Sequence, residues 1–356
     1  MRRHDIDTIR VVALCLLILY HIVIGFQPWG IWLNFVTNEQ QIETLWKILE
    51  LINIWRIPIL FVVSGMGISF AMQRRKLHQL LLERTRRIFV PLIFGSIFIV
   101  PIFMAIFNEY YNRPQIYQPN PGHLWFLSNI YLYVILLSPI FYYLNKHPGN
   151  YLFQLLRHAI TKPFIIIIAF SLPLIIESIL LNVNADNYAN FIIDEGWIHG
   201  LFIGMVCFIN GFVFVSLKDD FWHAVQKVKF LTLILAFMLY LGRIFDIDSS
   251  NSRILGNVLI SFEAANWMLA SFGLTAAYLN KPSKLLSYIS PAVFPIYIVH
   301  MPIQFLFSSV IFPLNVSVVA KLVLVLTLTY GGSLFTYEII KRLPWIRLLF
   351  GMKKSR

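Results

Sequence analysis

The feature that most constrains this chain is a series of ten apolar runs, each about as long as the 17–25 residues that cross a lipid bilayer. Hydrophobic residues make up 58% of the sequence and charged residues 13%, whereas soluble proteins are about half apolar and a quarter charged. We therefore expect an all-α fold, a polytopic transmembrane helical bundle. The expected spans lie near residues 9–27, 48–72, 88–107, 123–144, 163–183, 198–217, 229–246, 255–279, 291–313 and 317–340.

The segments between these runs are short, and none is long enough to form a second soluble domain. We therefore expect a single integral-membrane domain over residues 1–356. No small-residue cleavage site follows the first run, so we expect a span there rather than a cleaved signal. The two cysteines, Cys15 and Cys207, lie inside apolar runs, which favours packing roles over a disulfide.

Basic residues predict which side of the membrane each loop occupies. Of the 29 lysines and arginines, 23 fall in the N-terminus, the loops 73–87, 145–162, 218–229 and 280–284, and the tail after residue 340. The loops on the other side, among them 108–122 and 184–197, are richer in acidic residues. We therefore expect a multi-pass membrane protein with both termini in the cytoplasm. This distribution also accounts for the net charge of +12, so no nucleic-acid partner is expected.

Arg10 and His21 bracket the first apolar run. Eleven helical steps bring the two residues to within roughly 20° of one face and about 16 Å apart along the axis. With Arg10 at the cytoplasmic surface, His21 lies about half-way through the hydrocarbon core. Asp7, three residues before Arg10, falls on the same stripe. An ionisable group at that depth is usually functional; the alternative is a histidine hydrogen-bonded to a neighbouring helix.

The loop 73–87 ends in a basic cluster. Arg84 and Arg87 are three residues apart and share a helical face, a spacing suited to holding phosphate groups. This pattern favours a cytosolic anion such as a coenzyme phosphate. The alternative is that the loop only orients the protein in the membrane.

Charged residues also occur inside the second, seventh and eighth spans. Arg56 and Arg243 are both candidate partners for Glu263, and a structural ion pair is the alternative to a role in the site. Pro58 and the run Ser64–Gly67 favour a kink and close helix packing in the second span.

His123 and Trp125 open the fourth span, at the expected outer surface. His123 is a candidate contact for a hydroxylated acceptor, and the face of Trp125 suits stacking against a sugar ring. A tryptophan in the aromatic belt of the membrane interface is the usual alternative.

The ninth span carries a second mid-depth histidine, His300, which we expect at about the same depth as His21. Pro295 and Pro302 flank it and free backbone carbonyls that a cavity can use. The two histidines together favour a functional site over simple packing. The chain lacks the motifs of phosphate-binding loops, zinc proteases and α/β-hydrolases, so neither a metal nor a bound cofactor is expected.

At these residues the sequence resembles the acyltransferase 3 family of multi-pass membrane enzymes. The likeness is carried by Arg10 and His21, by Arg84 and Arg87, and by short blocks in the same order along the chain. Within the family it is most similar to the glucans biosynthesis protein C branch. The blocks are Asp7–Arg10, Arg56–Gly65, Glu83–Arg84, His123–Leu127, Phe294–Pro302 and Tyr337–Pro344.

The resemblance implies transfer of an acyl group, succinyl or acetyl, from a cytosolic acyl-CoA co-substrate to a hydroxyl of an extracytoplasmic glucan. It leaves open other envelope glycans or lipids as acceptors. The hypothesis gives His21 the role of general base, with Arg10, Arg84 and Arg87 holding the donor and Arg56, His123 and His300 lining the acceptor half. An acyl-histidine relay is the competing mechanism. A transporter or an export partner without catalysis stays open, and the sequence does not indicate the oligomeric state.

Overall fold

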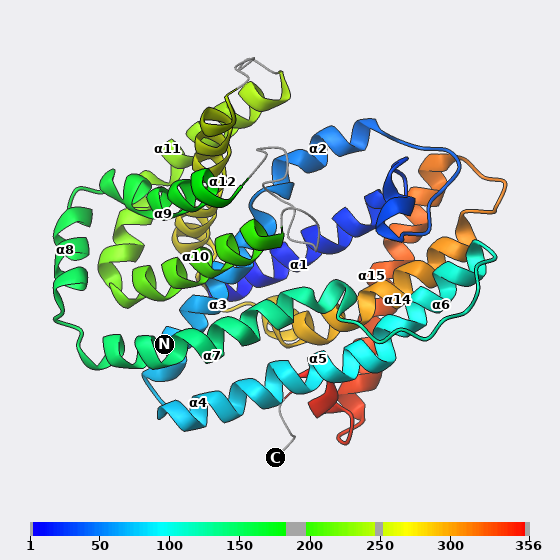
Figure 1. The fold of residues 1–356 in the computed structure, drawn as a ribbon, viewed down its shortest axis with the longest axis horizontal. Coiled ribbons are helices and arrows are strands. Elements are labelled where there is room, and N and C mark those ends of the chain that lie inside the picture. The colour runs from blue at the N-terminus through cyan, green and yellow to red at the C-terminus, as the bar shows by residue number, and fades with distance from the viewer. Residues whose placement is uncertain (1–2, 183–196, 246–251, 353–356) are drawn as a thin grey trace. The chain divides into compact units, whose positions relative to one another are not determined.

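The computed structural model describes residues 3–182, 197–245 and 252–352 (Figure 1). These residues form helices and contain no strand, so the predicted all-α class is confirmed for the described part of the chain. Residues 184–196 of one predicted outer loop and Asp246, at the end of the seventh predicted span, lie outside it.

The α-helices are α1 (His4–Ile24), α2 (Thr44–Asn53), α3 (Arg56–Met72), α4 (Leu77–Arg84), α5 (Val90–Phe94), α6 (Val100–Tyr110), α7 (Trp125–Lys146), α8 (Tyr151–Ile160), α9 (Ile165–Leu181), α10 (Trp197–Ser216), α11 (Asp219–Ile244), α12 (Arg253–Tyr278), α13 (Lys284–Ile289), α14 (Val293–Ile311) and α15 (Val318–Arg342). Shorter turns are η1 (Gly30–Leu33), η2 (Thr85–Phe89), η3 (Gly95–Ile99), η4 (Gly122–Leu124), η6 (Ser290–Ala292) and η7 (Arg347–Phe350).

The described residues contain nine helical stretches long and apolar enough to cross a membrane. They match nine of the ten predicted spans. The remaining predicted span, 163–183, corresponds to α9, a shorter apolar helix of 17 residues, which is close to the lower limit for crossing. The chain is therefore a polytopic helical membrane protein.

The second and third spans differ in detail from a straight helix. The second divides at Ile54–Trp55 into α2 and α3, and Pro58 lies in the first turn of α3, where its missing N–H costs no helical bond. A break before the proline replaces the predicted kink. The third runs from Leu77 to Tyr110 as one helical stretch that includes the π-helical turns η2 and η3.

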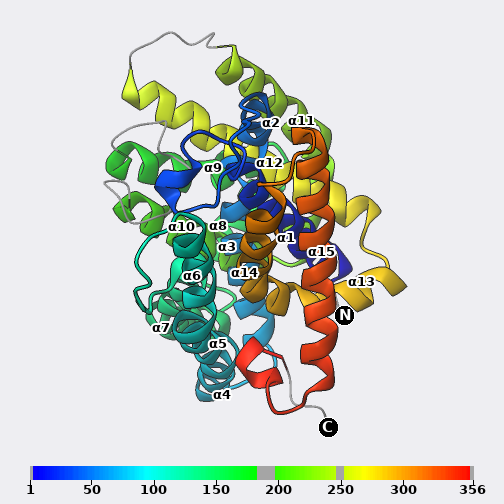
Figure 2. The same cartoon turned by 90° about the vertical axis from the view of Figure 1, so that its right-hand side faces the viewer.

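Backbone contacts divide the chain into two compact units. Unit 1 comprises Met1–Ala13, Leu51–Leu81 and Leu132–Leu286, and unit 2 comprises Leu14–Glu50, Leu82–Tyr131 and Ser287–Arg356. In unit 2, α14 packs along α15 and α6 (Figure 2).

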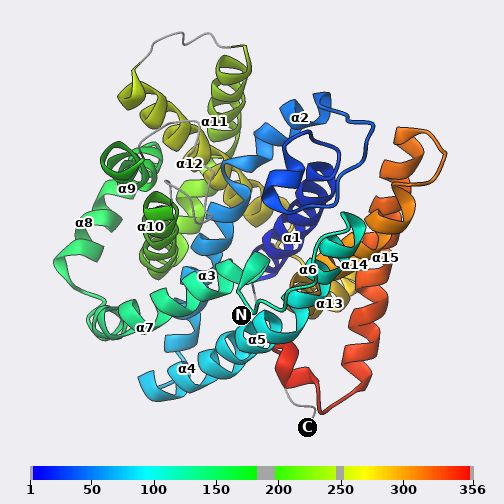
Figure 3. The same cartoon turned by 45° about the vertical axis from the view of Figure 1, so that its right-hand side comes forward.

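In unit 1, α3 packs along α10 at very short range (Figure 3). A Cβ atom on Gly65 of α3 would lie 1.9 Å from the carbonyl oxygen of Phe208, and one on Gly211 of α10 would lie 1.9 Å from that of Val62. The predicted close packing near Ser64–Gly67 is therefore confirmed, and small residues hold it, as is typical of helix pairs in membranes.

These contacts predict how two glycine substitutions differ. Gly211→Ala forces α10 away from the α3 backbone and should destabilise the protein by about 3 kcal/mol or more. Gly242→Ala, on α11, meets no atom within 4 Å and should be neutral or slightly stabilising. Thermal unfolding in detergent measures both. Equal midpoints for the two variants would contradict the packing described here.

Candidate active site

Two histidines from different ends of the sequence meet inside unit 2. Nδ1 of His21, on α1, lies 3.0 Å from Nε2 of His300, on α14. Their rings are parallel within 4°, with centroids 5.2 Å apart. His300 is fully buried, whereas His21 keeps part of its surface exposed. The structure thus brings together the two residues that the sequence predicts at one depth.

Backbone contacts fix which ring nitrogens carry hydrogen. Nδ1 of His300 lies 2.7 Å from the carbonyl oxygen of Tyr297, and because a carbonyl only accepts, this nitrogen donates. In the neutral ring, Nε2 of His300 then holds a lone pair and accepts from Nδ1–H of His21. By the same logic Nε2 of His21 holds a lone pair. The network therefore favours the tautomer of His21 that carries its hydrogen on Nδ1.

His123 joins this pair from the start of the fourth span. Its Nε2 donates to the carbonyl of Ile298 over 3.1 Å, and its ring meets that of His300 edge-on, with centroids 5.2 Å apart. Pro302 stands four residues after Ile298 and has no N–H to offer this carbonyl. The freed carbonyl predicted near Pro302 therefore exists, and His123 uses it.

Two further side chains of α14 secure the cluster. The hydroxyl of Tyr297 donates to the backbone carbonyl of His123. Nε2 of Gln304 donates over 2.8 Å to the carbonyl of His21, which lies in the last turn of α1. Neither residue was given a role from sequence, although their spacing of three and four residues from His300 places all three on one helix face.

Phenylalanine rings enclose the histidines. Phe35 lies 5.7 Å from the ring of His21 and 5.5 Å from Phe305. Phe103 lies 5.5 Å from the ring of His123 and 5.0 Å from Phe305. Such apolar surroundings lower the local dielectric and strengthen the hydrogen bonds between the imidazoles.

Two of the predicted donor-side arginines, Arg84 and Arg87, precede Phe103 on the same helical stretch. Nη1 of Arg87 lies 3.3 Å from Oε1 of Glu83, and its Nε lies 3.4 Å from the carbonyl of Gly351. Arg84 is the last residue of α4. The helical stretch from Arg87 to Phe103 covers roughly 20–24 Å.

Asp7 and Arg10 lie in unit 1, on the first half of α1. Their side chains approach to 3.6 Å, three residues apart along the helix, so the predicted shared stripe is present. Gly67 of α3 gives Arg10 room, since a Cβ atom there would lie 3.4 Å from Nη2 of Arg10.

Arg243 is the predicted partner that the structure places on Glu263. Nε and Nη2 of Arg243 bind its two carboxylate oxygens over 2.9 and 3.0 Å, and Nε1 of Trp267 lies 3.3 Å from it. Nη1 of Arg56 donates to Asn53 over 2.6 Å. The predicted Arg243–Glu263 pair is therefore present as a two-pronged contact, and the Arg56–Glu263 pair stays a prediction.

Unit 1 holds another buried pair that was not singled out from sequence. Nδ1 of His199, on α10, lies 2.9 Å from Oε1 of Glu177, on α9, and both residues are buried. The available signal was an ionisable residue within each of two apolar runs.

The predicted site residue Trp125 lies at the start of α7. Its ring is near that of Phe126, with centroids 6.3 Å apart.

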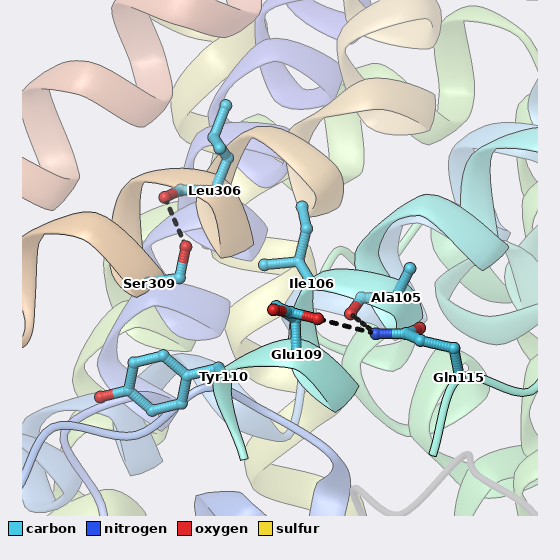
Figure 4. Close-up of a pocket in the computed structure, with 7 residues that line it drawn as sticks. All are labelled: Ala105, Ile106, Glu109, Tyr110, Gln115, Leu306 and Ser309. Carbon is cyan, nitrogen blue, oxygen red and sulfur yellow. Dashed lines mark hydrogen bonds between the residues drawn. The ribbon is translucent and has the colours of Figure 1, made fainter. Parts of the chain in front are cut away.

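A shallow groove of about 520 Å³ lies between the ends of α6 and α14 in unit 2 (Figure 4). Along the α6 side of the groove, Nε2 of Gln115 lies 3.1 Å from the carbonyl oxygen of Ala105 and 3.4 Å from Oε2 of Glu109. None of the predicted site residues lines this groove. Its lining residues are Ala105, Ile106, Glu109, Tyr110, Gln115, Leu306 and Ser309.

Comparison with known proteins identifies the family. A family model described as an acyltransferase domain, Acyl_transf_3, matches residues 3–338. No curated protein and no solved structure gives a significant match. The matched region includes the histidine cluster, the basic turn and both buried carboxylate pairs. The chain therefore belongs to the acyltransferase 3 family and is a membrane acyltransferase.

Proposed function

We propose that this protein is an O-acyltransferase of the cell (inner) membrane that moves a succinyl or acetyl group from cytosolic acyl-CoA to an extracytoplasmic glycan, with His21 as general base. The observation that carries the proposal is the 3.0 Å contact between His21 and His300. It directs the lone pair of His21 to Nε2, on a ring that is partly exposed. A base needs such an atom within reach of the hydroxyl that it deprotonates.

The proposed reaction proceeds by direct transfer. Nε2 of His21 takes the proton of the glycan hydroxyl while the oxygen attacks the carbonyl carbon of the thioester. The tetrahedral intermediate collapses as the C–S bond breaks, and the proton on Nε2 passes to the leaving sulfur. The products are an ester and a free thiol, and His21 returns to its starting form.

His300 acts through His21 and is a positioning residue. Once His21 is doubly protonated, Nε2 of His300 still accepts the hydrogen bond from Nδ1, and this contact stabilises the cation. The Tyr297 carbonyl holds His300 in the required tautomer, much as a second partner orients a metal-binding or catalytic imidazole. The lone pair on Nε2 of His21 also suits the acyl-histidine relay, in which that atom attacks the thioester directly.

On the donor side, we propose that Arg10, Arg84 and Arg87 hold the phosphates of acyl-CoA. Arg10 precedes His21 by eleven residues on one helix, about 16 Å along its axis. Arg87 lies roughly 20–24 Å along the helical stretch from Phe103, which contacts His123. A pantetheine arm spans a comparable length, so phosphates held at the arginines leave the thioester near the histidines.

The acceptor is proposed as an envelope glucan, on the strength of the sequence blocks shared with the glucans biosynthesis protein C branch. Other envelope glycans and lipids are the alternatives. Incubation of the protein in proteoliposomes with labelled succinyl-CoA or acetyl-CoA and purified glycans tests the proposal and identifies the acyl group. Absence of labelled ester on every glycan would contradict it.

Replacement of His21 tests its role as base. His21→Ala should lower kcat by about 10²–10⁴-fold, because the proton of the hydroxyl then has no acceptor, while the protein still inserts and folds. His147→Ala, on an exposed loop, is the control and should match the parent. A His21→Ala rate within a few-fold of the parent would remove His21 from the chemistry.

Replacement of the basic turn tests donor binding. Arg84→Ala and Arg87→Ala should each raise KM for acyl-CoA by about tenfold or more, since each removes a charge-assisted phosphate contact. Arg86 is exposed on the same turn, and Arg86→Ala controls for general loss of positive charge. Steady-state kinetics over a range of acyl-CoA concentrations gives the answer. If KM for acyl-CoA is unchanged in all three variants, or raised equally in all three, the cluster has only an orienting role.

A further inference from the structure

A continuous series of aromatic rings leads away from His21 within unit 2. The ring of Tyr20 lies 5.8 Å from that of His21 and 5.5 Å from that of Trp46. Trp46 in turn meets Trp29 at 4.5 Å between centroids, nearly perpendicular. Tyr20, Trp29 and Trp46, called here the aromatic platform, are each only partly buried.

The loop 25–43 brings the two tryptophans together although they lie 17 positions apart in the sequence. The backbone N–H of Asn38 donates to Gly25, and that of Ile42 donates to Phe26, over 2.8 and 3.0 Å. The side chain of Gln27 donates to the carbonyl of Ile42 over 3.1 Å. These bonds close the loop on itself, so that the start of α2 lies beside the end of α1.

The same loop is anchored to the rest of unit 2. Nζ of the buried Lys321, on α15, donates to the side chain of Asn38 and to the carbonyl of Phe312, over 3.2 and 2.5 Å. Gly30 is required by close packing, because a Cβ atom there would lie 2.4 Å from the carbonyl of Ile24. The aromatic platform is therefore held by a preorganised loop, which lowers the entropic cost of binding.

We propose that the aromatic platform binds a sugar ring of the acceptor glycan and presents the neighbouring hydroxyl to His21. This inference rests on the proposed function and adds the acceptor subsite and its preferred ring. A gluco-configured pyranose carries its hydroxyls at the rim and C–H groups on both faces. Those faces stack on indole and phenol rings, whose faces are electron-rich.

The polar groups around the platform suit a neutral glycan. Within the described residues, neither indole N–H, of Trp29 or of Trp46, donates to a protein acceptor, so both remain available for sugar oxygens. Glu39 and Glu43 are exposed on the same loop, and their carboxylates accept hydrogen bonds from hydroxyl groups. They also disfavour an acceptor that carries phosphate or carboxylate groups.

An aromatic belt at the membrane interface is the simpler explanation of these tryptophans. Trp32, on the same loop and 82% exposed, has the character of a belt residue. Trp29 and Trp46 differ from it, because their rings pack on each other and connect through Tyr20 to His21. Trp32 is therefore the matched control for a belt role.

Titration calorimetry of laminarihexaose, a β-linked gluco-oligosaccharide, into the protein in lipid nanodiscs without donor tests the platform. Trp46→Ala and Trp29→Ala should each weaken binding about tenfold or more, Trp46→Phe by less, and Trp32→Ala by less than about twofold. Thermal midpoints of the four variants show whether each is folded, and Trp46→Phe keeps a ring if the alanine variant unfolds.

Any of three results would contradict the proposed platform. The first is that Trp46→Phe and Trp29→Ala both bind the hexasaccharide as tightly as the parent protein does. The others are that Trp32→Ala loses as much affinity as the platform variants do, or that the parent protein shows no binding. Acyl transfer by the parent separates this inference from the proposed function. Platform-dependent binding without transfer to any glycan contradicts the function alone. Transfer to the hexasaccharide with the same KM in Trp46→Phe and Trp29→Ala contradicts the platform alone.

Discussion

The histidine cluster depends on backbone carbonyls that are left available inside a membrane helix bundle. A polar ring in a low-dielectric interior needs a partner for each donor, and α14 supplies two of them. The Tyr297 carbonyl accepts from His300, and the Ile298 carbonyl accepts from His123. Pro302 makes the second possible because it leaves Ile298 without a helical donor. Helix chemistry thus sets the tautomer of each imidazole.

The geometry of α14 places these contacts on one face. Tyr297, His300 and Gln304 follow each other at helical spacing, and each bonds to a residue from another part of unit 2. The end of α1 is bound twice, at the ring and at the carbonyl of His21. This double attachment holds the ring of His21 in place among the phenylalanines. If His21 is the base that we propose, a group held in this way needs little rearrangement during the reaction.

The sequence predicted those parts of the site that follow from helix periodicity and membrane depth. The spans, the shared depth of His21 and His300, the free carbonyl near Pro302 and the close packing near Gly65 belong to this group. Each depends on one segment and on the bilayer thickness.

Other parts depend on contacts between segments that are distant in sequence. The contact of Arg243 with Glu263, the Glu177–His199 pair and the meeting of Trp29 with Trp46 are of this kind. Periodicity places each residue on a helix face or in a loop, but it does not say which face meets which. The loop 25–43 also folds through hydrogen bonds that its composition does not reveal.

The central claim is that the Tyr297 carbonyl, through His300, leaves the lone pair of His21 on Nε2. Solid-state nuclear magnetic resonance of ¹⁵N-histidine-labelled protein in lipid, assigned with His21→Gln and His300→Gln, reports which nitrogen of each ring carries hydrogen. We expect Nδ1 to be protonated and Nε2 unprotonated in both residues at neutral pH. Protonation of Nε2 in His21, with Nδ1 bare, would contradict the account.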